Sequence, residues 1–355
     1  MWSNGATTAN TRIPVIAPAR GPLWGRHCPK CQGLARAKWL EQRKAERLPT
    51  DYFHVVFTLP EPIAAIAFFN KEAVYEILFR VTAQTLLTIA ADPKRLGVTL
   101  GFFCVLHSWG QNLHFHPHLH CVIPGGGLSA DERHWIAGRR RFFLPVRVLS
   151  RLFRRLFLAA LEKAYAAGKL QFFGDLQLLH APQAFTDYLA PLRRREWVVY
   201  AKPPFGGPQH VIEYLGRYTP RVAISNRRLL ALENGGVSFA WKDYREAGKA
   251  KVMTVSAEEF IRRFLPHALP SGLQRIRYYG FLANCHRARK IVLCRRLLAT
   301  PCSDLLPTPS DCRDFFQALT ARTQRHCPQC GIGILAGIPF QPPGRDPVAL
   351  RMDSS

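Results

Sequence analysis

The chain of 355 residues is 48% hydrophobic, which is enough apolar material for a folded core and excludes an intrinsically disordered protein. Its 49 Lys and Arg against 24 Asp and Glu give a net charge of +25, a surplus that predicts a polyanionic partner, most often nucleic acid. No run of about 18 apolar residues and no signal peptide are visible, so we expect no transmembrane helix and a cytoplasmic protein whose ten cysteines are reduced thiols or metal ligands.

The first 50 residues divide into two predicted parts. Residues 1–25 are rich in small residues, Pro and Gly and lack periodicity, which predicts a disordered or atypical N-terminus. Residues 26–50 contain Cys28 and Cys31 in RHCPKC, followed by a basic segment of helical character. A structural zinc ion takes four ligands, so this pair is a half-site that is either truncated or completed from elsewhere.

The next stretch predicts three strands and one or two helices. YFHVVFTLP (52–60) alternates and is rich in β-formers, so it predicts a strand that ends at Pro60. Residues 62–92 repeat apolar positions every three or four residues, as helices do. GVTLGFFCVLHSW (97–109) and LHFHPHLHCVIP (113–124) predict two strands joined by a turn, which together form an antiparallel hairpin.

Beyond three consecutive glycines the chain becomes more basic and more helical. The predicted elements are a helix in the second half of 137–170, a strand in 196–205, a short helix in 207–220, a hairpin around 234–236, and a strand leading into a helix in 251–269. Ser256 and Glu259 have the spacing of a capping box at the start of that last helix.

The C-terminal tail, residues 301–355, is Pro-rich and carries a second CxxC motif, Cys327 and Cys330 in RHCPQC. These two cysteines are candidates for the ligands that complete the first pair. They could equally form an independent half-site or belong to a packed core.

Five of the 13 histidines stand in one short segment: His107, His114, His116, His118 and His120. Because alternate side chains of a strand share a face, the last four lie on one side of the predicted strand. His118 and His120 can therefore point at a common divalent ion, with a third ligand from the neighbouring strand. His107 is the preferred third ligand and His116 is the second choice. The alternative to a metal site is a chance pair of histidines on an exposed strand.

Two tyrosines stand four residues apart in EYLGRY, so a helix places the phenols of Tyr214 and Tyr218 on one face. An aromatic pair packed on the core is the alternative. Four basic residues surround the pair and are candidate DNA contacts: Arg217, Arg221, Arg227 and Arg228. Cationic neighbours and a metal-polarised phosphate are the help that a tyrosine nucleophile with a pKa of about 10 requires.

With both elements present, the chain resembles the two-tyrosine HUH transposases of rolling-circle insertion sequences. The HUH motif (His, bulky hydrophobe, His) matches residues 118–120 in HPHLHCVIPGGG, and the paired tyrosines match Tyr214 and Tyr218 in YLGRYTPRVAISN. The resemblance covers about residues 26–300 and includes HCPKCQGLARAKWL, FHVVFTLP, LHSWGQNL and YYGFLANCHRARKI. The order of the motifs along the chain fits as well. The tyrosines follow the histidines here, whereas conjugative relaxases usually place the tyrosine before the histidines.

The resemblance implies an α+β fold: an HUH-endonuclease-like central antiparallel sheet, with the histidine strand in the middle and helices on one or both faces. It implies a catalytic domain in 51–300, preceded by a small partial zinc-ribbon-like segment in 26–50. Two departures stand out. Relatives usually open with a fuller zinc-binding module, whereas residues 1–25 contain neither Cys nor His, and Pro220 stands where many relatives carry a histidine.

The implied function is that of a DNA transposase, a metal-dependent single-strand DNA endonuclease and strand transferase with a 5′-phosphotyrosine intermediate. His118, His120 and His107 would hold magnesium or manganese, the tyrosines would be the nucleophiles, and zinc would bind the CxxC. The partner would be mainly single-stranded transposon ends and target DNA, in a prokaryotic nucleoid. A rolling-circle initiator of plasmid or phage replication, with the same chemistry, and a non-catalytic zinc-containing DNA-binding protein remain alternatives.

Overall fold

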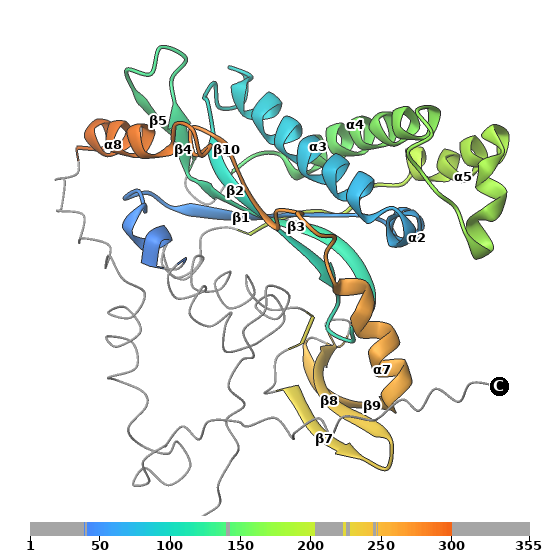
Figure 1. Cartoon of the computed structure of the whole chain (residues 1–355). Coiled ribbons are helices and arrows are strands. Elements are labelled where there is room, and N and C mark those ends of the chain that lie inside the picture. Colours follow the sequence, from blue (N-terminus) through green and yellow to red (C-terminus); the bar gives the residue numbers. More distant parts are fainter. Residues whose placement is uncertain are drawn as a thin grey trace, which may run out of the picture. The chain divides into compact units, whose positions relative to one another are not determined.

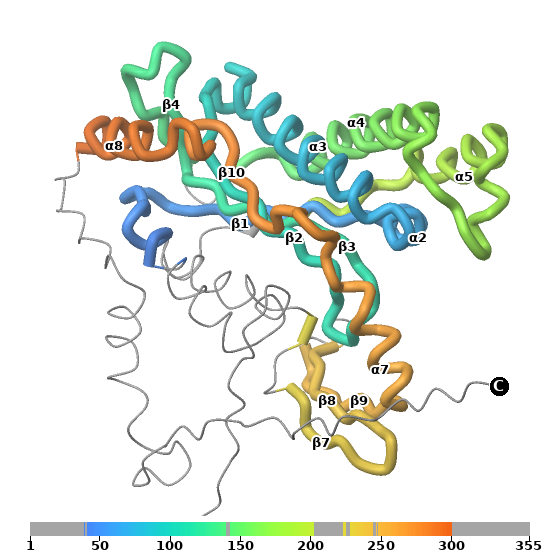
Figure 2. Tube along the Cα trace, viewed as in Figure 1, coloured from blue at the N-terminus to red at the C-terminus, as the bar shows by residue number. Residues whose placement is uncertain are grey.

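The computed structural model describes residues 39, 41–139, 143–202, 223–224, 228–243, 246 and 248–299. Its centre is a five-stranded antiparallel sheet (Figures 1 and 2). In spatial order the strands are β10 (Ile276–Gly280), β2 (Gly101–Trp109), β3 (Phe115–Pro124), β1 (Tyr52–Thr58) and β6 (Val199–Lys202). The expected α+β class is therefore confirmed, with the histidine strand β3 in the middle of the sheet.

One face of this sheet forms the main hydrophobic core. Phe53, Val55 and Phe57 of β1 alternate toward it, as do Leu119 and Cys121 of β3, and all five are buried. Helices cover this face, as Figure 1 shows for α3 and α4. They are α2 (Glu61–Phe69), α3 (Lys71–Ala91), α4 (Val146–Ala166) and α5 (Pro182–Arg194), with a 3₁₀ helix η1 (Gly174–His180).

The helices follow the predicted periodicity. The apolar stretch expected to form one or two helices forms two, divided at Asn70. In α4, Leu149, Phe153 and Phe157 lie on one side and are buried, whereas Arg151 and Arg155 are exposed. Among the described residues, helix α3 is long and apolar enough to cross a membrane by length and composition, but 67% of its most apolar stretch is buried inside the fold, as expected of a core helix.

The opposite face of the sheet carries the alternate residues of the same strands, which point away from α3 and α4. Tyr52, Phe103, Val105 and Val122 form a smaller buried cluster there, against which Trp39 and Tyr278 pack. This face of β1, β2 and β3 also carries four histidines: His54, His107, His118 and His120. The histidines therefore stand on the face opposite to α3 and α4, beside an apolar and aromatic surface.

A second, three-stranded sheet contains β7 (Leu229–Glu233), β8 (Gly236–Asp243) and β9 (Lys249–Ser256). Asn234 and Gly235 both have positive φ, 50° and 72°, as the type I′ turn of a two-residue hairpin requires. Ser256 accepts a hydrogen bond from the Glu259 backbone N–H (3.2 Å) and caps α7 (Ala257–Phe264), so the Ser256 half of the predicted capping box is confirmed. The Glu259 carboxylate accepts hydrogen bonds from Arg262 and Arg263.

The three glycines after β3 are explained by close packing. They lead into a two-stranded sheet of β4 (Gly126–Leu128) and β5 (Trp135–Ala137). A Cβ atom on Gly126 would lie 2.5 Å from the Ile136 carbonyl oxygen, and one on Gly127 would lie 2.6 Å from that of Thr99. Any larger residue would push these backbones apart. Two further elements of the described residues are the 3₁₀ helix η4 (Leu265–His267) and helix α8 (Arg287–Leu297).

Several predictions lie outside the described residues. These are the N-terminus 1–25, the half-site Cys28 and Cys31, the short helix 207–220 with Tyr214 and Tyr218, and the tail 301–355.

Candidate metal centre

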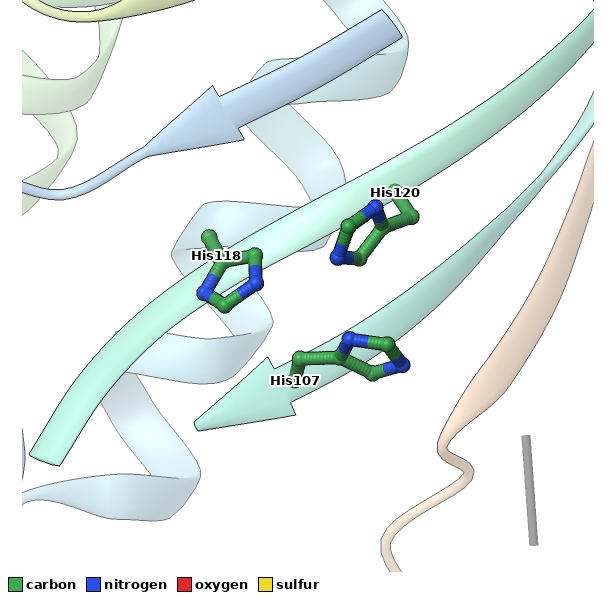
Figure 3. Close-up of side chains that lie close together, drawn as sticks. All are labelled: His107, His118 and His120. Carbon is green, nitrogen blue, oxygen red and sulfur yellow. The ribbon is translucent and has the colours of Figure 1, made fainter. Parts of the chain in front are cut away.

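Three imidazoles converge on the sheet face opposite α3 and α4. His118 and His120 stand two residues apart on β3, and His107 on β2 is the direct cross-strand partner of His118. One ring nitrogen from each residue lies within 4.8 Å of the others. Figure 3 shows the three rings gathered between the two strands. The predicted third ligand, His107, thus lies where a common ion would need it.

Hydrogen bonds fix the orientation of two of these rings. Nδ1 of His118 lies 2.6 Å from the His116 carbonyl oxygen, which can only accept, so this nitrogen donates and Nε2 keeps its lone pair. Nδ1 of His120 lies 2.7 Å from Nε2 of His54 on β1. An imidazole that donates through one nitrogen and offers the other is the usual arrangement of a metal-ligating histidine.

Burial keeps the three imidazoles neutral. His107 is only 4% exposed. Desolvation is the largest cause that lowers the pKa of all three rings, and it lowers the pKa of His118 to about 3. Repulsion between the neighbouring imidazoles lowers each pKa further. Neutral imidazole is the form that binds metal, so the donor set fits a divalent cation without prior deprotonation at neutral pH.

A cation adds positive charge beside the imidazoles. Arg275, just before β10, donates from Nε to the Leu106 carbonyl oxygen (3.0 Å), and its guanidinium lies 4.8 Å from the centre of the Trp109 ring. Its charge also lowers the pKa of His107 and His120. Neutral ligands leave the charge of a bound divalent ion uncompensated, so ion and arginine together would attract an anion such as a phosphodiester.

The other predicted site residues are placed as follows. His116, the second choice for third ligand, is not part of the convergent group, and its backbone carbonyl orients His118 instead. The exposed His114 hydrogen-bonds the Asn112 side chain in the hairpin turn.

Arg228 links the two sheets. It donates from Nε to the Ala240 carbonyl oxygen (2.7 Å) and from a terminal nitrogen to that of Gln111. The remaining predicted site residues lie outside the described residues: Tyr214, Tyr218, Arg217, Arg221, Arg227, Cys28 and Cys31.

Sequence reasoning missed His54 and Arg275 as neighbours of the site. His54 did carry a signal, because it is the one histidine in the strand Tyr52–Thr58, which is otherwise apolar apart from Tyr52 and Thr58 at its ends. The alternation of the strand predicts on which face His54 lies, but it does not predict that this strand pairs with β3. Arg275 reaches the site only because β10 pairs with the outer edge of β2, a contact between segments far apart in the chain.

An antiparallel sheet that presents three neutral, convergent imidazoles beside an arginine defines a candidate metal-dependent enzyme acting on an anionic substrate. The family model described as "Putative transposase" (Y2_Tnp) matches residues 101–290, and the model described as "Transposase zinc-binding domain" (Zn_Tnp_IS91) matches residues 24–59. The chain belongs to the two-tyrosine transposases of rolling-circle insertion sequences, the family that its motifs resemble, and it is a DNA transposase.

Two relatives support this assignment. "Putative transposase y4qJ" of Sinorhizobium fredii is 63% identical over 310 residues, which cover 87% of this chain and 78% of the relative. "Transposase for insertion sequence element IS801" of Pseudomonas savastanoi pv. phaseolicola is 29% identical over 297 residues, which cover 78% of this chain and 65% of the relative.

Solved structures of the conjugative relaxase TrwC in complex with oriT DNA show a weaker likeness. The match to the metal-free structure covers 69% of this chain and 72% of the relaxase chain, with 14% identity and a TM-score of 0.26. The metal-bound structure has a TM-score of 0.27 at the same identity. At these scores the likeness adds nothing to the assignment.

Proposed function

We propose that this transposase is a metal-dependent endonuclease and strand transferase acting on single-stranded DNA in rolling-circle transposition. The observation that carries the proposal is the convergence of His107, His118 and His120 as neutral ligands on one sheet face. The family match over residues 101–290 contains these histidines together with both tyrosines, which supports assigning the ligands and the nucleophiles to one region.

The chemistry assigns Tyr214 and Tyr218 as successive nucleophiles. The phenolate oxygen of one tyrosine attacks phosphorus, the bond from phosphorus to the 3′ oxygen breaks, and that oxygen takes up a proton to become a free 3′-hydroxyl. The products are a 5′-phosphotyrosine link and a primer end, and the phosphodiester energy is conserved for rejoining. A second tyrosine lets the protein hold a second strand before the first is released.

The ion at the three imidazoles is magnesium or manganese in this proposal. When bound, it would polarise a non-bridging oxygen of the scissile phosphate. Nitrogen ligands favour manganese over magnesium, which prefers oxygen ligands. Arg275 would contact the same phosphate, and Arg217, Arg221 and Arg227 would hold the strand beside the tyrosines, with Arg228 at the hairpin turn.

The proposed domain arrangement follows the sequence boundaries. Residues 51–300 form the catalytic domain and 26–50 the partial zinc-binding module, with zinc at Cys28 and Cys31. Residues 1–25 and 301–355 flank these parts. Single-stranded transposon ends and target DNA are the substrates, which places the protein at the nucleoid of a prokaryotic cell.

A gel assay tests the proposal. The protein is incubated with single-stranded oligonucleotides carrying the ends of its element plus Mn²⁺, and the products are separated under denaturing conditions. A covalent protein–DNA band that disappears in His118→Ala and in the double variant Tyr214→Phe, Tyr218→Phe supports the proposal. A double variant that behaves like the wild type would instead favour a non-catalytic DNA-binding protein.

A further inference from the structure

A fourth histidine contacts the metal centre from a third strand. His54 on β1 is 4% exposed, and its Nε2 lies 2.7 Å from Nδ1 of His120. We infer that His54 is a positioning residue that holds His120 in the orientation and tautomer required to bind the ion. The inference rests on the metal site of the proposed function but not on the tyrosine chemistry.

The sheet register brings His54 to this place. The direct partner of His120 on β1 is Val56, and His54 stands opposite Val122, so His54 and His120 are diagonal neighbours on one face. On the other side, His120 is opposite Val105, which makes His107 its second diagonal neighbour. The ring centres of His54 and His107 lie 4.9 Å and 4.3 Å from that of His120. The His120 ring is therefore held between a ligand partner and His54.

The proton between the two rings decides whether His120 can bind metal. If His120 donates from Nδ1 to Nε2 of His54, its own Nε2 carries a lone pair and can bind the ion. If His54 donates instead, a neutral His120 carries its proton on Nε2 and cannot bind through that atom. Metal binding therefore selects the first arrangement, with His54 protonated on Nδ1. An acceptor at this place does for His120 what the His116 carbonyl oxygen does for His118.

Substitutions of His54 separate the acceptor role from packing. Glutamine has a polar end at about the reach of Nε2 and can accept the hydrogen bond, whereas leucine fills similar space but cannot accept. Phe53→Leu is the matched control, because Phe53 is its neighbour on β1, is equally buried and faces the core on the other side of the sheet. It perturbs the same strand without touching an imidazole.

The experiment measures Mn²⁺ binding by titration calorimetry on the full-length chain without DNA, and the visible spectrum of bound Co²⁺ as a report on the ligands. We expect His54→Leu to weaken Mn²⁺ binding by about 10–100-fold, the usual effect of losing an outer hydrogen-bond partner. The Co²⁺ spectrum should change with it. His54→Gln and Phe53→Leu should bind like the wild type.

Wild-type Mn²⁺ affinity in a folded His54→Leu, or an equal loss in His54→Gln and His54→Leu, would overturn the inference. If His54→Leu does not fold, His54→Asn replaces it, because asparagine is too short to reach His120; equal affinities of the Asn and Gln variants would then overturn it. A wild type without Mn²⁺ binding would overturn both this inference and the proposed function. A wild type that binds Mn²⁺ but forms no DNA adduct would contradict the tyrosine chemistry alone.

Discussion

Metal binding at the three imidazoles should be almost independent of pH in the range where exposed histidines lose their metals. The perturbation is a change from pH 7.5 to 5.5. The pKa of His118 is lowered from 6.5 to about 3, first by desolvation and then by neighbouring imidazoles. Desolvation and nearby charges move the pKa of His107 and His120 in the same direction.

The expected magnitude follows from proton competition. An imidazole with an ordinary pKa of about 6.5 is about 90% protonated at pH 5.5, which costs about tenfold in metal affinity for each ligand and about 1,000-fold for three. A ligand with a pKa of about 3 is still neutral at pH 5.5 and costs nothing. Because burial also lowers the pKa of His107 and His120 well below 6.5, we expect the Mn²⁺ dissociation constant to change far less between these pH values than the about 1,000-fold of solvated ligands.

Calorimetric titration with Mn²⁺ at pH 7.5, 6.5 and 5.5 measures this dependence, with circular dichroism at each pH to show that the fold persists. A surface-exposed histidine-tagged peptide is a suitable control, since its imidazoles titrate normally. A loss of affinity that approaches 1,000-fold would show that the ligands are solvated, and it would refute the reasoning from burial.

Three further predictions follow from other contacts. Desolvation lowers the pKa of His267, which is 1% exposed, to about 4, so acid protonates this residue in the unfolded chain before it does so in the folded protein. Between pH 7.5 and 5.5 this residue should therefore lower the free energy of unfolding by about 1.4 kcal/mol, and urea titrations should find that loss reduced in His267→Gln. Arg275→Gln should weaken single-stranded DNA binding and reduce the log–log salt slope by about 0.7 while Mn²⁺ affinity does not fall; an unchanged slope in fluorescence anisotropy would exclude Arg275 as a phosphate contact. Gly126→Ala should lower the melting temperature, because its Cβ would lie 2.5 Å from the Ile136 carbonyl oxygen, whereas Gly168→Ala, at a position with open space, should cost only the strain of its positive φ.

The local part of the site could be predicted from the sequence. A strand alternates its side chains, so His118 and His120 had to share a face with each other. The short turn after Trp109 made β2 and β3 a hairpin, which placed His107 within reach. These inferences need only neighbouring residues and a single turn, and the structure agrees with both.

The non-local part could not be predicted, because it depends on pairings between distant segments. His54 lies beside His120 because β1 pairs with β3, and the helices α2 and α3 separate these two strands in the chain. The pairing of β10 with β2, which brings Arg275 to the imidazoles, spans still more of the sequence. The glycines after β3 carried a turn signal, but their close approach to the Ile136 and Thr99 backbones is visible only in three dimensions.

The most direct test of the account is mass spectrometry of the covalent product after proteolysis. Wild-type protein is incubated with Mn²⁺ and a single-stranded oligonucleotide that contains the element's end, and the DNA-linked peptide is sequenced. We expect a nucleotide attached through its 5′ phosphate to Tyr214 or Tyr218, and no such peptide from His118→Ala. DNA cleavage without a protein link, or a link at a residue other than these two tyrosines, would contradict it.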